Sequence, residues 1–167
     1  MKLNKKGFML AEVVVVAVVI ATVLVTLYTA LNRVSSAYET RNRYYDIDSL
    51  YAAIEINEIL KELSSTNIYE IDTPQEVSAI DSEIETFNNF YYNETNSSIT
   101  AYFTPYDKDN MLYLKNLNSN LTFNDYLDYL SDNLDFEDEY NYMIIVERRN
   151  NDNIDDCYYY ALKVRHV

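Results

Sequence analysis

One carboxylate, Glu12, lies inside the longest apolar run of the chain. The run extends from Phe8 to Leu31 and contains no other charged side chain. A carboxylate inside a membrane helix costs about 2.5–3.5 kcal/mol on insertion scales, and such residues usually mark a site. Glu12 is therefore a candidate for pairing with a positive charge, because pairing offsets the cost of placing each charge in an apolar environment.

The apolar run predicts a helix that spans a bilayer, which takes roughly 20 residues. Three lysines among the first six residues predict that the N-terminus stays in the cytoplasm and that the C-terminal part is exported. An ordinary signal peptide cleaved near Ser35-Ser36-Ala37 is disfavoured, because its apolar region is only about 7–15 residues long. A plain single-pass anchor leaves Glu12 unexplained.

The segment Lys5-Lys6-Gly7-Phe8-Met9-Leu10-Ala11-Glu12 resembles the prepilin peptidase motif of type IV pilins and type II secretion pseudopilins. The resemblance implies that a peptidase recognises Lys5 and Lys6 in a leader and cuts after Gly7. It also implies that Phe8 becomes an N-methylated N-terminus. Glu12 is then the fifth residue of the mature chain and serves assembly.

The chemistry of the segment agrees with these implied roles. Cleavage creates an amine at Phe8 that keeps its positive charge after methylation. In a filament of parallel helices, Glu12 of one subunit can meet this amine on a neighbour staggered along the axis, which sets the register. Gly7, the only glycine of the chain, offers the extended, unhindered backbone that a peptidase needs at the scissile bond.

The segment departs from the family pattern in two ways. Met9 and Ala11 replace the Thr and Ile often seen there, and both remain compatible with a helix. The anchor has neither Gly nor Pro after Gly7, so we expect a continuous helix, which favours a minor pilin or a pseudopilin over a major pilin. The resemblance covers about 30 residues and does not identify the rest of the chain.

Other candidate sites are weaker. Cys157 and His166 are the only cysteine and histidine, and without an orienting third group they predict a packed Cys and a surface His. Zinc would need more His or Cys ligands. The stretches Asp152–Asp156 and Asp107–Asn110 lack the spacing of calcium loops and are expected to be turns. Asp132–Glu139 is expected to be a solvated acidic surface. We expect no cofactor, no metal and no enzymatic activity.

Composition narrows the possible classes further. The formal charge is −14, and loss of the leader lysines leaves 10 basic against 27 acidic side chains, or −17. Such a surface repels phosphates, so direct nucleic acid binding is not expected. One glycine and two prolines argue against sandwich or barrel folds with many tight turns and against Gly-rich phosphate loops. A single cysteine forms no intramolecular disulfide.

A helical pattern without Gly or Pro continues beyond the membrane run. We expect one spine helix over Phe8–Leu63, stopped by Ser64–Asn67. Its second half should bury one apolar stripe against a head domain. This stripe consists of Ile47, Leu50, Tyr51, Ile54, Leu60 and Leu63. The predicted division is a leader (1–7), a transmembrane or filament-core helix (8–31), an amphipathic continuation (32–65) and an extracytoplasmic head (66–167).

The head is expected to be α+β, with a small antiparallel sheet of about four strands and one or two short helices packed on the spine. Pro74 predicts a helix that starts at Thr73 and ends near Asn89, followed by a polar loop over Tyr91–Ser98. Another helix is predicted to start at Thr122. The predicted strands are Ile99–Thr104, Met111–Leu117, Tyr140–Arg149 and Cys157–Val167, with turns at Tyr106–Asn110 and Asn150–Asp156.

These features predict a structural subunit of a type IV pilus-like filament, a minor pilin or pseudopilin. A competence pseudopilus that serves DNA uptake is a close variant. The expected partners are the membrane, the prepilin peptidase and other pilin subunits. The chain would be a single-pass membrane protein with an exported head before it joins a cell-surface filament. The alternative is a membrane-tethered extracellular binding module that does not polymerise.

Overall fold

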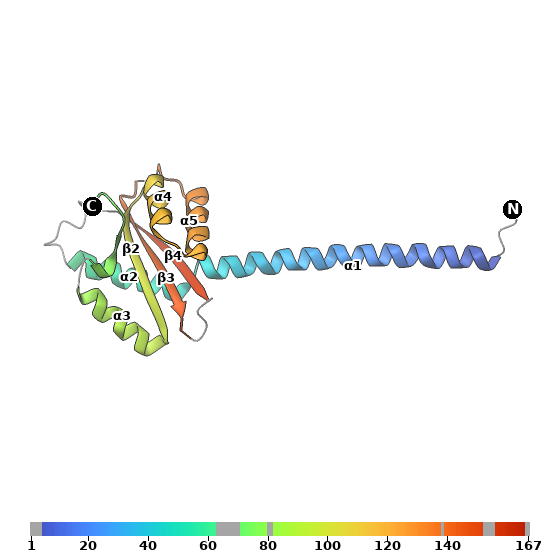
Figure 1. The fold of residues 1–167 in the computed structure, drawn as a ribbon, viewed down its shortest axis with the longest axis horizontal. Helices are drawn as coiled ribbons and strands as arrows, with labels where there is room; N and C mark the ends of the chain where they lie inside the picture. Colours follow the sequence, from blue (N-terminus) through green and yellow to red (C-terminus); the bar gives the residue numbers. More distant parts are fainter. Residues whose placement is uncertain (1–4, 63–70, 80–81, 138, 152–155, 166–167) are drawn as a thin grey trace. The chain divides into compact units, whose positions relative to one another are not determined.

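The computed structural model describes residues 5–62, 71–79, 82–137, 139–151 and 156–165. The chain divides into two compact units, residues 1–41 and residues 42–167. The elements in chain order are α1 (Lys5–Tyr44), α2 (Ile47–Glu62), β1 (Gln75–Glu76), the 3₁₀ turn η2 (Val77–Ala79), α3 (Ser82–Thr95), β2 (Ser97–Pro105), α4 (Lys108–Leu117), α5 (Leu121–Asn133), β3 (Tyr142–Asn150) and β4 (Cys157–Val164) (Figure 1). The fold is α+β, as expected.

The first unit is formed by α1, which is continuous over the apolar run. Its side chains from Met9 to Arg41 are exposed all round the helix. Threonine hydroxyls turn back onto the helix: Thr22 Oγ1 donates to Val18 O at 2.8 Å, and Thr29 Oγ1 donates to Val25 O. The hydroxyls of these threonines are thus satisfied within the helix, as a lipid environment requires. The helix is long and apolar enough to be compatible with a membrane anchor.

The prediction of one uninterrupted spine helix is wrong, because Tyr45 and Asp46 separate α1 from α2. Asp46 acts as the N-cap of α2, since Asp46 Oδ2 accepts from Ser49 N at 2.9 Å and Asp46 O accepts from Leu50 N at 3.0 Å. The backbone N–H of Asp46 donates to Tyr159 O of β4 at 3.3 Å. Contacts within the second unit therefore end the helix where no Gly or Pro does.

Within the described residues, four antiparallel strands form a sheet of order β1-β2-β3-β4. β2 pairs with β3 along its whole length, with Ser97 opposite Asn150 and Pro105 opposite Tyr142. β4 pairs with the other edge of β3, with Cys157 opposite Arg149. The predicted C-terminal hairpin and the strand at Ile99–Thr104 are confirmed, each with slightly different bounds.

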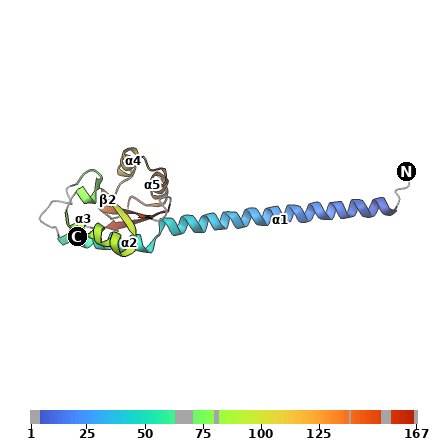
Figure 2. The same ribbon diagram turned by 60° about the horizontal axis from the view of Figure 1, so that its bottom comes forward.

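Helices cover both faces of this sheet (Figure 2). On β3, Ile144 and Val146 face one apolar core with α2 and α3, whereas Met143 and Ile145 face a second core with α4 and α5. Successive strand residues point to opposite faces, so a strand buried on both sides must be apolar throughout. The run Met143–Val146 meets this requirement, since all four side chains are fully buried.

The buried face of α2 differs from the predicted stripe. The residues that face the sheet are Ser49, Ala52, Ala53, Ile56 and Leu60. Of the predicted stripe, Ile47, Tyr51 and Ile54 are exposed and Leu63 lies outside the described residues. Small residues let α2 approach the sheet closely, and this favourable packing outweighs the burial of the larger side chains.

The first predicted helix of the head begins later than expected. Gln75 and Glu76 form β1 opposite Phe103 and Tyr102, and α3 begins only at Ser82. It continues to Thr95, so the predicted loop over Tyr91–Ser98 is wrong. The chain turns at Asn96, which has a φ of 52°, a left-handed conformation that Asn tolerates better than most residues.

The predicted strand at Met111–Leu117 is wrong, because this segment belongs to α4. Asp107 caps the helix, with Asp107 Oδ1 accepting from Asn110 N at 2.9 Å. Met111 and Leu114, three residues apart, point into the core, whereas Leu112 and Leu117 stay exposed. The helix predicted from Thr122 is confirmed as α5, so the described head has three helices after α2 rather than one or two.

Candidate functional site

The residues of the prepilin-like motif lie at the start of α1. Lys5, Lys6, Gly7 and Phe8 occupy its first turn, and their side chains lie outside what the structure describes. The first four N–H groups of a helix have no partner within the helix, so this turn unwinds more easily than the next. The extended backbone expected at the Gly7–Phe8 bond therefore requires only local unwinding, which glycine favours by about 0.5–1 kcal/mol relative to alanine.

Glu12 lies one turn beyond this segment, on the exposed surface of α1. Its neighbours at helical spacing, Val15 and Val16, are exposed and apolar. Within the described part of the chain, no residue forms an ion pair or hydrogen bond with Glu12. A lone carboxylate on an apolar helix needs a partner once the helix leaves water. The geometry is suited to pairing with a cation from another molecule.

In the second unit, a buried ion pair joins β3 to the junction of α1 and α2. Arg148 Nε donates to Asp46 Oδ2 at 2.9 Å, and Arg148 Nη2 donates to Asp46 Oδ1 at 3.0 Å. The two side chains are only 12% and 13% exposed. The Arg148 guanidinium also lies 4.5 Å from the ring centroid of Tyr158 and 3.7 Å from Asp48.

This arrangement sets the charge state of Asp46. Burial raises the pKa of the carboxyl, but hydrogen bonds from Arg148 and Ser49 outweigh burial and hold the pKa below its ordinary value of 3.8. Asp46 is therefore ionised at neutral pH. Because it caps α2 and binds Arg148 in two places, it holds the start of α2 against the sheet, which is a structural role.

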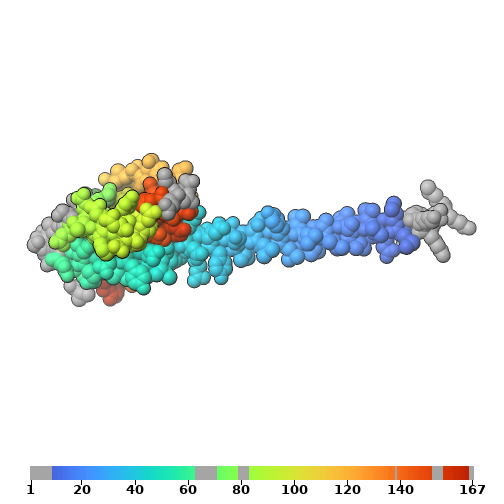
Figure 3. All heavy atoms as spheres, turned by 90° about the horizontal axis from the view of Figure 1, so that it is seen from below, coloured from blue at the N-terminus to red at the C-terminus, as the bar shows by residue number. Residues whose placement is uncertain are grey.

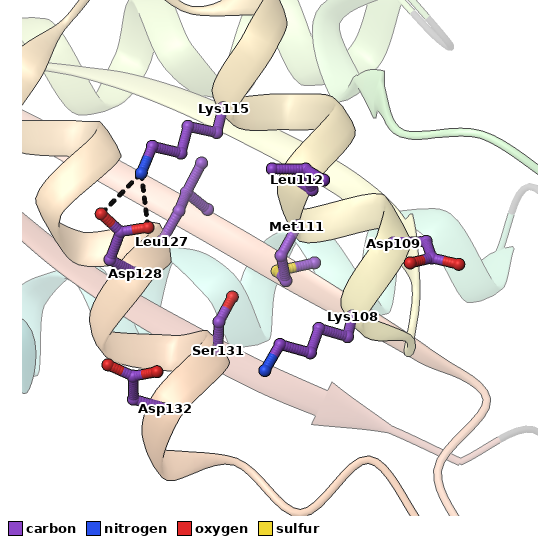
Figure 4. A pocket seen from close by; sticks show the side chains of 9 residues that line it. All are labelled: Lys108, Asp109, Met111, Leu112, Lys115, Leu127, Asp128, Ser131 and Asp132. Carbon is purple, nitrogen blue, oxygen red and sulfur yellow. Dashed lines mark hydrogen bonds and ion pairs between the residues drawn. The ribbon is translucent and has the colours of Figure 1, made fainter.

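A hollow of about 290 Å³ lies between α4 and α5 (Figure 4). Met111 and Leu127 line it, and Lys115 Nζ bridges the two helices by contacting both carboxylate oxygens of Asp128 at 2.6 Å. Its one hydroxyl, on Ser131, has no hydrogen bond among the described residues. Lys108 and Asp132 line the same hollow, but neither is hydrogen-bonded to Ser131, so the hydroxyl has no base in place to activate it.

The remaining candidates are Cys157, His166 and the acidic stretch Asp152–Asp156. Cys157 is only 4% exposed and contacts Arg149, in agreement with the expected packed Cys. His166 and residues 152–155 lie outside the described residues, and Asp156 lies 3.9 Å from Arg43. Among the described residues, no cluster of three or more His, Cys, Asp or Glu side chains could hold a metal ion.

Comparison of the chain with protein-family models, with curated proteins and with solved structures finds no match. Function is therefore inferred from the residues and geometry of the chain itself. The sequence located Glu12 but missed the pair of Asp46 and Arg148. An Asp directly before the apolar Ile47 is a helix N-cap signal, whereas the Arg, 102 positions away, carries no local signal.

Proposed function

We propose that the chain is a non-enzymatic structural subunit of a type IV pilus-like filament, a minor pilin or pseudopilin. A prepilin peptidase cuts it after Gly7, Phe8 becomes the methylated N-terminus, and α1 anchors it in the membrane with the second unit exported. Subunits then assemble into a cell-surface filament through their α1 helices. The observation that carries this proposal is Glu12, an exposed carboxylate that has no partner among the described residues and is the only charge in the apolar run 8–31, five residues into the proposed mature chain.

The proposed pairing explains why a charge is kept at this position. The amine of Phe8 and the carboxylate of Glu12 are each unfavourable in lipid, and a staggered neighbour brings them together. Small and β-branched side chains around Glu12 allow close helix packing in the apolar layer. The pair then contributes to register more than to binding strength.

The first experiment is mass spectrometry of the N-terminal peptide of the protein purified from its native cells. We expect a peptide that begins at N-methylated Phe8. An intact Met1 would contradict processing and would support the membrane-tethered binding module. A start at Tyr38 would indicate a secreted domain instead.

A second experiment tests assembly. Glu12→Ala should leave the amount of membrane-inserted protein unchanged and reduce its recovery in sheared filaments at least about tenfold, because a subunit that is not held in register loses its helix contacts as well as the pair, and about 1.4 kcal/mol is enough for that factor. Val15→Ala, on the same helix surface, is the matched control and should assemble normally. Normal incorporation of Glu12→Ala would refute the amine–carboxylate pairing.

A further inference from the structure

Two exposed helical stripes of the chain have the same spacing. On α1, beyond the membrane run, Val34, Tyr38 and Arg41 follow one another at i, i+4 and i+7, and Val34 and Tyr38 are 58% and 66% exposed. On α2, Ile47, Tyr51 and Ile54 have the same spacing and are 65%, 63% and 40% exposed. Residues so spaced share one face of a helix.

The α2 stripe has no place in the core of its own unit. The opposite side of α2 is the one that packs on the sheet, through Ala52, Ala53 and Ile56. Figure 3 shows α2 lying uncovered beside α3 on this face of the second unit. An apolar stripe left outside a complete core is typical of a surface that binds another helix.

The two stripes carry opposite charges. The α2 stripe is flanked by Glu55 and Glu62, neither of which has a partner within the described residues. Glu58 lies on the same face and is neutralised in part by Lys61 at 2.8 Å. The α1 stripe includes Arg41, which also lacks a partner in the described part of the chain.

We propose that the α2 stripe of one copy binds the α1 stripe of a second copy, with the two helices parallel. In this register Val34 lies beside Ile47, Tyr38 beside Tyr51, and Arg41 beside Ile54 and Glu55. The inference rests on the proposed function, because filament subunits all point the same way, and it names a second copy of this chain as a neighbour. The contact is head-to-tail because it joins two different stripes, so a copy that has bound through one stripe keeps its other stripe free for a further copy.

The test uses two differently tagged full-length copies in the native cells, both with Cys157→Ala so that the native thiol is removed. One copy carries Tyr38→Cys and the other carries Tyr51→Cys. Mild oxidation should join the two introduced cysteines in a disulfide, which gives a cross-linked product that carries both tags. The matched control replaces Tyr51→Cys with Tyr92→Cys on α3, because Tyr92 is also exposed, at 49%. We expect at least about fivefold more cross-linked product from the Tyr38–Tyr51 pair than from the control.

Charge reversal tests the register. Arg41→Glu in the first copy should lower the yield about three- to tenfold, as expected for replacing an attractive surface pair by a repulsive one. Glu55→Arg in the second copy should then restore the yield to within about twofold. A yield no greater than that of the Tyr92→Cys control overturns the inference.

The N-terminal peptide and the filament fraction are measured in the same cells, which separates this inference from the proposed function. If the filaments contain methylated Phe8 but no disulfide forms between positions 38 and 51, only the stripe contact is overturned. An intact Met1 together with the disulfide overturns the filament proposal and supports the contact as one between membrane-anchored copies.

Discussion

Asp46→Ala tests whether the ion pair with Arg148 stabilises the second unit. The variant loses the α2 N-cap, which contributes about 1 kcal/mol. It also leaves Arg148 buried without its main partner, and breaking a buried pair in this way costs about 3–5 kcal/mol. Because Arg148 keeps Asp48 at 3.7 Å and the ring of Tyr158, we expect the broken pair to cost about 3 kcal/mol, the lower limit, and the variant to lose about 4 kcal/mol in total.

The assay is urea unfolding of the full chain in a non-ionic detergent, followed by the near-ultraviolet circular dichroism of the tyrosines. Most of the tyrosine pairs that stack in the core belong to the second unit, so this signal reports its packing. Asp48→Ala is the matched control, because this carboxylate approaches the same guanidinium but is 64% exposed. It should cost less than about 1 kcal/mol.

A double-mutant cycle separates the ion pair from the cap. Arg148→Met keeps an apolar stem and removes the buried charge, so Asp46→Ala in that background should cost mainly the lost cap. We expect a coupling energy of about 1.5–3 kcal/mol between Asp46 and Arg148. A coupling energy near zero, or a loss below about 0.5 kcal/mol for Asp46→Ala alone, would refute the stabilising role of the pair.

Three further predictions follow from the same structure. The pKa of Asp46 is lower in the folded chain than its ordinary value of 3.8, so ionised Asp46 stabilises the fold above pH 3.8. This contribution is lost as the pH falls through the lower pKa of the folded state. Asp46→Asn should therefore reduce the dependence of the free energy of unfolding on pH between pH 5 and pH 2. Ile144→Ala, in the centre of the sheet, should lower the free energy of unfolding by about 2–5 kcal/mol, whereas Ile47→Ala on the exposed stripe should change it by less than about 0.5 kcal/mol, as measured by urea unfolding. Gly7→Val should prevent cleavage of the leader, and an immunoblot that shows normal conversion to the shorter form would contradict the recognition of this bond.

Several elements could be predicted from local patterns. The apolar run predicts the helix α1 because its length and composition suit a helix in an apolar environment such as a bilayer. The aromatic and β-branched residues of β3 and β4 predict the hairpin, since both strands and their turn are adjacent in sequence. Glu12 was identified as a candidate site because a charge in an apolar run is conspicuous without any structure.

Other elements were decided by tertiary contacts. The segment Met111–Leu117 has enough apolar residues for a strand; the local cap at Asp107 favours a helix, and the burial of Met111 and Leu114 in the core, with Leu112 and Leu117 exposed, fixes it as one. The α2 face was predicted wrongly because sequence hydrophobicity favours Ile47 and Tyr51, whereas close packing on the sheet favours Ala52 and Ala53.

The amino-acid sequence by itself therefore determines the long apolar helix and the C-terminal hairpin, which depend on residues close together in the chain. Only the tertiary structure decides where the spine helix ends. Asp46 is a local N-cap signal for α2, but the break at Tyr45 and Asp46 also depends on Arg148 and Tyr159, which lie about a hundred positions further along. Hydrogen bonds to distant strands outweigh the modest preference of a short segment to continue as a helix.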